Sequence, residues 1–461
     1  MSQEQQLKEN MMGYLPIPEL LMKVSLPMIL SMLVQALYNV VDSVFVSRIS
    51  ADAFSALNLM FPIQTLMIAV GSGTGVGMNA LLSKSLGEKK FDQANETAKN
   101  GIFLAVCSFV LFFLVGALGS EAYFKGMQVN AETVSNGTVY MRIVTMCSFG
   151  MFIQMVMERL LQSTGLSIYS MVTQMFGAVI NLVLDPVLIF GLLGAPKMGV
   201  AGAAVATVTG QIVAAVLAVW FNIWKNKELA IQMKGFRPNG RMIGKIYSVG
   251  IPAIFMQAIA SIMNFCMNHI LLMVDVTQVG VNVFGAYFKL NSIIFMPVFG
   301  LNNGMVPILA YNYGARHRKR IVDTIKFSVG IAVCFMMVGM AMFLGIPDRL
   351  LGFFDATPEM IAMGVPAFRI ICLSFIFAGF CIVLLSVFQA FGSGMLSLVV
   401  SASRQLLVLV PAAYLFAVTL GIHAVWWSFP IAEIVSILLC MVFYRHLYRT
   451  KIALLDDEKK N

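Results

Sequence analysis

Charged side chains are scarce in this sequence. Asp, Glu, Lys and Arg make up 11% of its 461 residues, whereas hydrophobic residues make up 59%. A soluble globular protein carries about 25% charged residues. So few charges cannot cover a water-facing surface of this size. The composition therefore excludes a soluble protein.

Strict alternation of polar and apolar residues is also missing. Transmembrane β-strands alternate over about 10 positions, and stretches such as 205–220 and 331–346 do not. Only helices and closed barrels satisfy every backbone polar group in lipid, so we expect an all-α integral membrane protein. Runs of roughly 20 apolar residues predict twelve transmembrane helices, at 20–47, 54–83, 98–118, 137–160, 168–192, 200–224, 246–272, 280–312, 325–346, 364–388, 395–418 and 423–446.

Catalytic and metal-binding motifs are absent as well. The four histidines have no metal-ligand spacing, and the seven cysteines contain no C-x-x-C pair. Neither H-E-x-x-H, G-x-S-x-G nor a Walker-type G-K-[ST] motif occurs. We therefore expect no enzyme activity and no cofactor. Without an ATP site, any transport would draw its energy from an ion gradient.

The net charge of +9 arises from 31 Lys and Arg against 22 Asp and Glu. Cytoplasmic loops of membrane proteins are enriched in Lys and Arg, which explains the excess without a nucleic-acid partner. The basic loops alternate along the chain, and the opposite side carries acids. This pattern predicts a multi-pass protein of the cytoplasmic (inner) membrane with both termini in the cytoplasm.

One long hydrophilic segment divides the chain nearly in half. We predict a cytoplasmic N-terminus at 1–19, an N-lobe of six helices at 20–224, a cytoplasmic connector at 225–245, a C-lobe of six helices at 246–446 and a cytoplasmic tail at 447–461. Because six is an even number, both lobes cross the membrane in the same direction. The expected architecture is a parallel repeat with a pseudo-two-fold axis along the membrane normal.

The two halves resemble each other in register. Matching residues 227 positions apart are Gly73 and Gly300, Gly77 and Gly304, Gly87 and Gly314, Arg142 and Arg369, Gln162 and Gln389, and Gly165 and Gly392. Pro27 and Pro252, at an offset of 225, recur where proline kinks a helix. Secondary transporters commonly use such repeats and bind substrate between the lobes. The alternative is a duplicated receptor, scaffold or membrane enzyme.

The symmetry breaks at intramembrane acids of the first lobe. Asp42 shares one helix face with Gln35 and Asn39, and Met267 stands at the position that matches Asp42. Asp185 follows Asn181 by one turn, and the matching residues in the second lobe are apolar. Carboxylates inside a bilayer commonly serve as proton relays or ion ligands. Thr207 supplies a further oxygen for a small cation.

Each of these groups also has a structural interpretation. Asp42 and Asp185 would then only hydrogen-bond a neighbouring helix. Glu158 and Arg159 are interpreted as snorkelling anchors near the cytoplasmic end. The other charged residues within apolar runs have open roles: Lys289 and Arg404 as anchors, pairing groups or anion ligands, and Glu433 as a packing or pairing group.

At this point the chain resembles the multidrug and toxic compound extrusion (MATE) family, over about residues 15–448. The resemblance rests on the two six-helix lobes, the run QALYNVVDSVFVS from Gln35, the Gln162-x-x-Gly165 turn and Asn181-x-x-x-Asp185-Pro186. The sequence is most similar to the DinF-like and MepA-like branch. That branch's first-lobe cation site maps onto Asp42, Asn181, Asp185 and Thr207. The NorM-like branch relies on second-lobe acids, and no matching acid stands beside Gln257 and Asn264.

The resemblance implies an antiporter that exports lipophilic, often cationic compounds in exchange for H⁺ or Na⁺. The expected partners are amphipathic organic molecules and membrane lipid. The expected working unit is a monomer, because one chain already contains both lobes. Gln35, Asn39, Gln257 and Asn264 are predicted to line the substrate cleft. The alternative is a flippase for lipids or lipid-linked oligosaccharides, for which Lys289 and Arg404 are the candidate cations in the cavity.

Overall fold

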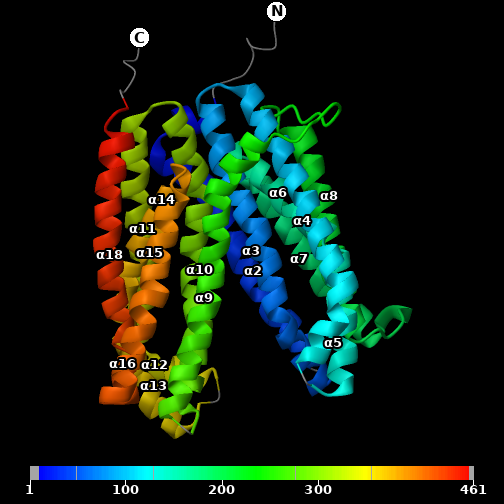
Figure 1. Ribbon diagram of the computed structural model, residues 1–461, viewed down its shortest axis with the longest axis vertical. Coiled ribbons are helices and arrows are strands. Elements are labelled where there is room, and N and C mark those ends of the chain that lie inside the picture. Colours follow the sequence, from blue (N-terminus) through cyan, green and yellow to red (C-terminus); the bar gives the residue numbers. More distant parts are fainter. Residues whose placement is uncertain (1–9, 48, 128, 276, 355, 456–461) are drawn as a thin grey trace, which may run out of the picture.

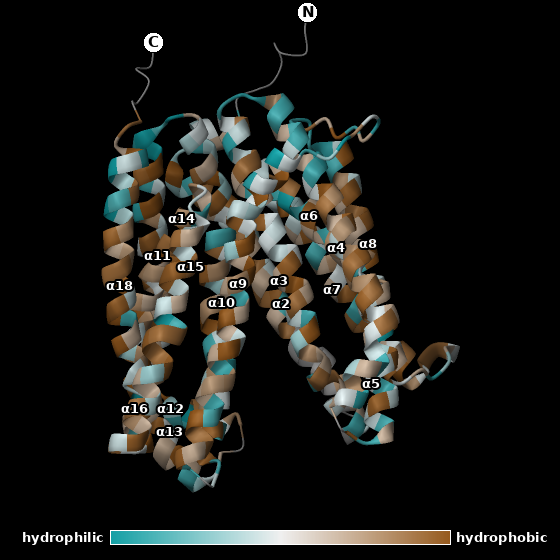
Figure 2. Cartoon of the chain, in the orientation of Figure 1, coloured by the Kyte–Doolittle hydropathy of each residue, from teal (hydrophilic) through white to brown (hydrophobic). Residues whose placement is uncertain are grey.

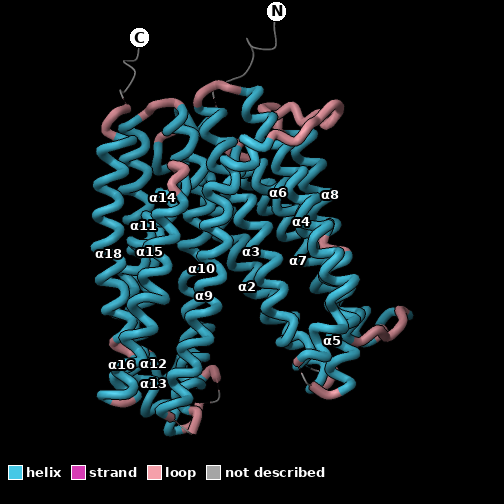
Figure 3. Tube along the Cα trace, viewed as in Figure 1, coloured by secondary structure: helices cyan, strands magenta, loops and turns pink. Residues whose placement is uncertain are grey.

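A computed structural model describes residues 10–47, 49–127, 129–275, 277–354 and 356–455. The side chains of residues 38–44, 46, 47, 51 and 54 lie outside this description. Every regular element within these ranges is a helix, and loops are confined mainly to the two ends of the bundle (Figure 3). The predicted all-α class is confirmed.

The first half of the chain forms one bundle. After the short α1 (Met11–Tyr14), its helices are α2 (Ile17–Ser47), α3 (Ala51–Gly87), α4 (Phe91–Gly126), α5 (Ala131–Met146), α6 (Phe149–Ser163), α7 (Ser167–Phe190) and α8 (Val200–Lys225). α5 and α6 follow each other with a bend of 43° and together are long enough for one span. Six spans therefore arise from this half.

The second half forms the other bundle. Its helices are α9 (Gly240–Val274), α10 (Val279–Gly314), α11 (Arg318–Gly345), α12 (Pro347–Gly352), α13 (Pro358–Ile371), α14 (Phe375–Ala390), α15 (Gly394–Ala402), α16 (Val410–Leu420), α17 (Ile422–Val425) and α18 (Ser428–Leu447). A π-helix, η4 (Ser403–Leu409), joins α15 to α16. Among the described residues, 11 helices have the length and apolarity of a span, and the bent pair brings the total to 12. The twelve-helix prediction is confirmed.

Several helices begin outside the apolar runs that predicted them. α2 begins at Ile17 and α9 at Gly240, so residues 17–19 and 240–245 are helical rather than part of the polar segments. At α9 the side chain of Asn239 accepts hydrogen bonds from the backbone N–H groups of Arg241 and Met242, at 3.0 and 3.4 Å. Capping of this kind fixes where a helix starts, whereas apolarity marks only the part that lies in lipid.

The two bundles form separate lobes (Figure 1). They meet at the end where both termini lie and diverge toward the end that carries α5, α12 and α16. Across the junction α3 packs against α9 and α10, and α2 packs against α10. The outer helices carry hydrophobic colours along much of their length (Figure 2), and large apolar side chains such as Ile223 and Leu438 are exposed there. A bilayer would cover these surfaces.

Six glycines, which we call the glycine seam, bring the lobes into backbone contact: Gly73, Gly77, Gly87, Gly300, Gly304 and Gly314. A Cβ atom on Gly73 would lie 2.7 Å from the carbonyl oxygen of Gly250, and one on Gly300 would lie 2.5 Å from the Cα of Ile29. A Cβ atom on any of the other four glycines would lie closer still to an atom of the opposite lobe. The glycines paired by the sequence repeat therefore make equivalent contacts on the two sides of the junction.

The segment of residues 10–15, which we call the amino-terminal strap, crosses the junction at this same end. On the N-lobe side the Asn10 amide donates to the carboxylate of Glu228 at 2.7 and 2.8 Å and to the carbonyl of Thr164 at 3.2 Å. Burial raises the pKa of Glu228, although the hydrogen bonds from Asn10 oppose that shift.

On the C-lobe side the strap is held by side chains of α10 and α11. Arg320 donates to the carbonyl oxygens of Met12 and Leu15 at 2.9 and 2.8 Å, and Asn312 donates to Met12 O at 3.0 Å. The Met12 side chain is fully buried. The strap therefore contacts both lobes at once, which the polar composition of residues 1–19 did not predict.

We expect Arg320→Ala to loosen the strap. The variant removes two charge-assisted hydrogen bonds to the strap, each of which contributes about 1.5–3 kcal/mol, and a third to Asn312, which itself holds the strap. Amides of residues 12–15 should exchange with deuterium at least about tenfold faster than in the unmodified protein. Arg449→Ala, at an exposed position of the C-terminal π-turn, is the matched control. Unchanged exchange in Arg320→Ala would contradict this account of the strap.

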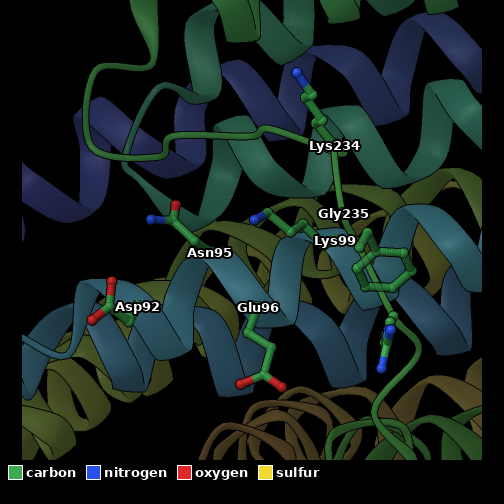
Figure 4. A pocket seen from close by; sticks show the side chains of 8 residues that line it. Asp92, Asn95, Glu96, Lys99, Lys234 and Gly235 are labelled. Carbon is green, nitrogen blue, oxygen red and sulfur yellow. The ribbon is translucent and has the colours of Figure 1, made fainter.

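The connector between the lobes lies along α4. The side chains of Asn95 and Asn100 accept from the backbone N–H groups of Ala230 and Asn239, at 2.8 and 3.0 Å. A pocket of about 350 Å³ lies between connector and helix, and Figure 4 shows the charged and polar side chains of α4 that line it. Its lining mixes acidic and basic residues, most of them exposed or partly exposed. We assign no site to it.

Candidate functional site

A cavity of about 1010 Å³ lies between the lobes. This volume is at the upper end of the range of about 300–1,000 Å³ that is typical of pockets for small organic molecules. Methionine, phenylalanine and tyrosine side chains alternate on its walls with amides and a few charges. The polar lining includes Gln35, Gln154, Glu158, Gln174, Asn181, Thr207 and Gln211 from the N-lobe, and Gln257, Asn291, Gln389, Arg404 and Glu433 from the C-lobe. Such walls suit an amphipathic molecule.

Asn181, Asp185 and Thr207 form a buried cluster at the N-lobe wall. The Asn181 amide donates to Asp185 Oδ2 at 2.9 Å and accepts from the backbone N–H of Thr207 at 2.9 Å when its Nδ2 faces the carboxylate. The Thr207 hydroxyl lies 3.2 Å from the same amide. Asp185 is 0% exposed, whereas Asn181 and Thr207 reach the cavity. The cluster thus places a carboxylate directly behind the cavity wall.

Close packing of α7 on α8 makes this cluster possible. A Cβ on Gly210 would lie 2.6 Å from the carbonyl oxygen of Gly177, so the two helices approach to backbone contact at these glycines. Asn181 stands one turn after Gly177 and Thr207 nearly one turn before Gly210. Their short polar side chains can therefore meet across the helix pair.

The remaining predicted residues fall into three groups. Gln35 and Gln257 line the cavity, whereas Asn264 is not among the lining residues and accepts from Asn268 at 3.4 Å. The side chains of Asn39 and Asp42 lie outside the described part of the structure. The two prolines predicted as kink positions, Pro27 and Pro252, are buried inside α2 and α9. Their roles stay predictions.

The interpretation of Glu158 as a snorkelling anchor is wrong, because its side chain faces the cavity. Its carboxylate lines the cavity, is 5% exposed, and accepts from Gln154 at 2.9 Å, Thr173 at 2.8 Å and Gln174 at 2.7 Å. These neutral donors satisfy the hydrogen-bonding capacity of the carboxylate inside the protein. A signal was available in the sequence, because Gln154 precedes Glu158 by one helical turn on the same face.

Arg159 also turns inward. Its guanidinium donates to Gln162 at 2.9 Å and, across the junction, to Asn303 of α10 at 3.1 Å. It lines the same cavity. The predicted anchor is therefore a polar contact between the lobes at the closed side of the cavity.

In the C-lobe wall Arg404 of η4 and Glu433 of α18 form an ion pair at 3.2 Å. Pairing was one of the alternatives for both residues. Lys289 is exposed, does not line the cavity, and lies 5.9 Å from the ring centroid of Phe354. Of the two cations considered for a flippase cavity, only Arg404 faces it.

A protein-family model named MatE matches residues 27–187 and again 252–415. The chain belongs to the MatE family. One match falls in each half, in agreement with the repeat found in the sequence. The resemblance to the MATE family and its MepA-like branch is confirmed.

Relatives of the MatE chain include the multidrug export protein MepA of Staphylococcus aureus (strain MSSA476), which is 24% identical over 445 residues and 96% of each chain. MepA of Staphylococcus haemolyticus (strain JCSC1435) is 26% identical over 91% of this chain and 92% of that protein.

Solved MATE structures share the fold. One is described as the outward-facing conformation of a multidrug resistance MATE family transporter of the MOP superfamily. Its TM-score is 0.89 at 23% sequence identity, and the match covers 97% of this chain and 98% of that one. A MOP superfamily transporter from Pyrococcus furiosus has a TM-score of 0.87 and is 23% identical in sequence. The match covers 98% of this chain and 99% of that one. Twelve helices in two lobes are therefore the architecture of this MatE protein.

Proposed function

We propose that this chain is a secondary multidrug efflux antiporter that exports lipophilic, often cationic compounds in exchange for H⁺ or Na⁺. The observation that carries the proposal is the large cavity of about 1010 Å³, which is lined by both lobes and backed by a buried carboxylate in one of them. The MepA relatives, which are named multidrug export proteins, support it. The transported compound leaves chemically unchanged.

Coupling would reside in the N-lobe cluster. A buried carboxylate in a region of low dielectric is stabilised by taking up a proton or a small cation. Asp185, Asn181 and Thr207 supply carboxylate, amide and hydroxyl oxygens, which are hard ligands suited to Na⁺ and equally able to stabilise a protonated acid. We include Asp42 in this set on the basis of the sequence. Uptake of the coupling ion changes the charge behind the wall and so disfavours a bound cation.

Glu158 would receive the cationic part of the exported compound. Its carboxylate is held by three neutral donors. An organic cation that enters the cavity supplies the missing positive charge next to aromatic and methionine side chains. Recognition by one charge and apolar contact tolerates many structures, as a multidrug site requires.

The lobes are in contact where the termini lie and apart at the opposite end (Figure 1). With both termini in the cytoplasm of an inner-membrane protein, as the charge pattern predicts, this arrangement corresponds to an outward-open state. Rocking of the lobes about the cavity would then expose it to the cytoplasm. One chain supplies both lobes, so the proposed working unit is a monomer embedded in lipid.

The test is efflux of a fluorescent lipophilic cation from proteoliposomes. A pH gradient and a sodium gradient are imposed separately, and vesicles without protein measure passive leak. We expect efflux well above the leak under one of the two gradients. Movement of a labelled lipid between leaflets is measured in the same vesicles. Lipid movement without efflux of any cation in a panel of dyes would favour the flippase and refute the antiporter.

A further inference from the structure

The C-lobe wall of the cavity carries an ion pair, whereas Glu158 and Arg159 on the N-lobe wall form no ion pair with each other in the described part of the chain. Arg404 and Glu433 both line the cavity, as do their repeat-related counterparts in the N-lobe, Gly177 and Gln211. The counterparts hold no charge. Conversely, Glu158 of the N-lobe is matched by the apolar Leu385. Arg159 is likewise matched by the uncharged Ser386, so the two walls carry their charged side chains at different positions of the repeat.

The ion pair leaves most of the guanidinium unused. Arg404 Nη1 donates to Glu433 Oε1 at 3.2 Å, the one hydrogen bond that Arg404 makes in the described part of the chain. An arginine side chain offers five N–H donors in a planar fork. The Arg404 side chain is 16% exposed, and it lines the cavity. Its spare donors thus lie where a molecule in the cavity can accept from them.

The ion pair with Glu433 keeps this guanidinium in place. Glu433, whose side chain is 11% exposed, balances its charge, so the arginine needs no ligand to remain buried. Arg404 also lies in the π-helix η4, and π-helical turns occur frequently at functional sites. The neighbouring Gln405 is fixed by a hydrogen bond to Ser401 at 3.1 Å. The wall is preorganised before anything binds.

We propose that Arg404 is a specificity-determining residue of the cavity and binds a carboxylate of the exported compound. The inference rests on the proposed efflux function. A carboxylate matches the guanidinium fork and forms two parallel charge-assisted hydrogen bonds. The positive group of the same molecule is received by Glu158 across the cavity. Because a zwitterion brings both charges, the net charge of the cavity is unchanged when it binds.

A matched pair of dyes tests the proposal. One is a rhodamine ethyl ester with a single positive charge, and the other is the same rhodamine with the ester hydrolysed to a carboxylate. Initial efflux rates of both are measured in proteoliposomes. The double variant Arg404→Gln/Glu433→Gln removes both charges together. We expect it to export the acid dye about tenfold more slowly than the unmodified protein does. The export rate of the ester dye should stay within about twofold of its original value.

Arg404→Lys is the second variant. It keeps the charge opposite Glu433 and removes only the planar fork, so it remains informative if the double variant fails to fold. We expect a selective loss for the acid dye, smaller than that in the double variant. An equal loss for both dyes would assign the pair a purely structural role, and an unchanged rate for the acid dye would also overturn the inference.

Export of the two dyes by the unmodified protein distinguishes a failure of this inference from a failure of the proposed function. Export of both dyes supports the two together. Export of the ester dye but not of the acid dye overturns the Arg404 inference and leaves the efflux function standing. Export of neither dye, nor of the wider cation panel, counts against the efflux function itself.

Discussion

Asp185→Asn is expected to reduce gradient-driven efflux to the level of vesicles without protein. The substitution keeps the size and polarity of the side chain but removes the carboxylate that would take up H⁺ or Na⁺. Asp185 is 0% exposed and bonded to the Asn181 amide, so nearby water cannot replace it. Because coupling requires an ion-binding group, the loss should be nearly complete under either gradient.

Controls separate coupling from folding in this experiment. Asp92→Asn, at an exposed position in the first turn of α4, should retain the original efflux rate. Binding of the dye to Asp185→Asn, measured by fluorescence polarisation, should persist, because the substrate residues are untouched. Asp42→Asn is expected to behave like Asp185→Asn. Efflux that survives in Asp185→Asn would place the coupling site elsewhere in the chain.

Gly77→Ala is expected to destabilise the protein strongly. The added Cβ would overlap the backbone carbonyl oxygen of Ile246 in the opposite lobe. A backbone atom cannot rotate away as a side chain does, so the lobes must separate at the seam. Overpacking typically costs about 1–3 kcal/mol, and we expect a loss at or above the upper end of that range.

Thermal unfolding in detergent measures this effect. Gly330→Ala, in α11, is the matched control, because a Cβ there meets no atom within 4 Å. Alanine in place of an unconstrained helical glycine favours the helix by up to about 1 kcal/mol. The two substitutions should therefore shift the unfolding temperature in opposite directions. An equal shift in both variants would show that the seam tolerates an extra methyl group.

The contacts of the glycine seam were only partly predictable from the sequence. The offset of 227 residues identified Gly73 and Gly300 as equivalent positions. Spacing along a chain does not tell which helix lies opposite. The partners Gly250 and Ile29 therefore became visible only in the structure.

The candidate site was predictable to a similar degree. Asn181, Asp185 and Thr207 stood out because carboxylates and amides are costly in lipid, and the structure brings these three together. Glu158 was misinterpreted because its donors Thr173 and Gln174 come from α7, 15 and 16 residues further along the chain. A buried charge looks like an anchor until its partners in space are known.

The amino-terminal strap has a thermodynamic consequence for alternating access. Its hydrogen bonds to Thr164 of the N-lobe and to Arg320 of the C-lobe coexist only while the lobes are together at that end. Opening that end must release one side, so the strap's binding free energy enters the equilibrium constant between the two states. Each 1.4 kcal/mol changes that constant about tenfold. A short segment at the junction of the lobes thus helps to set the resting population of a transporter whose cavity it does not line.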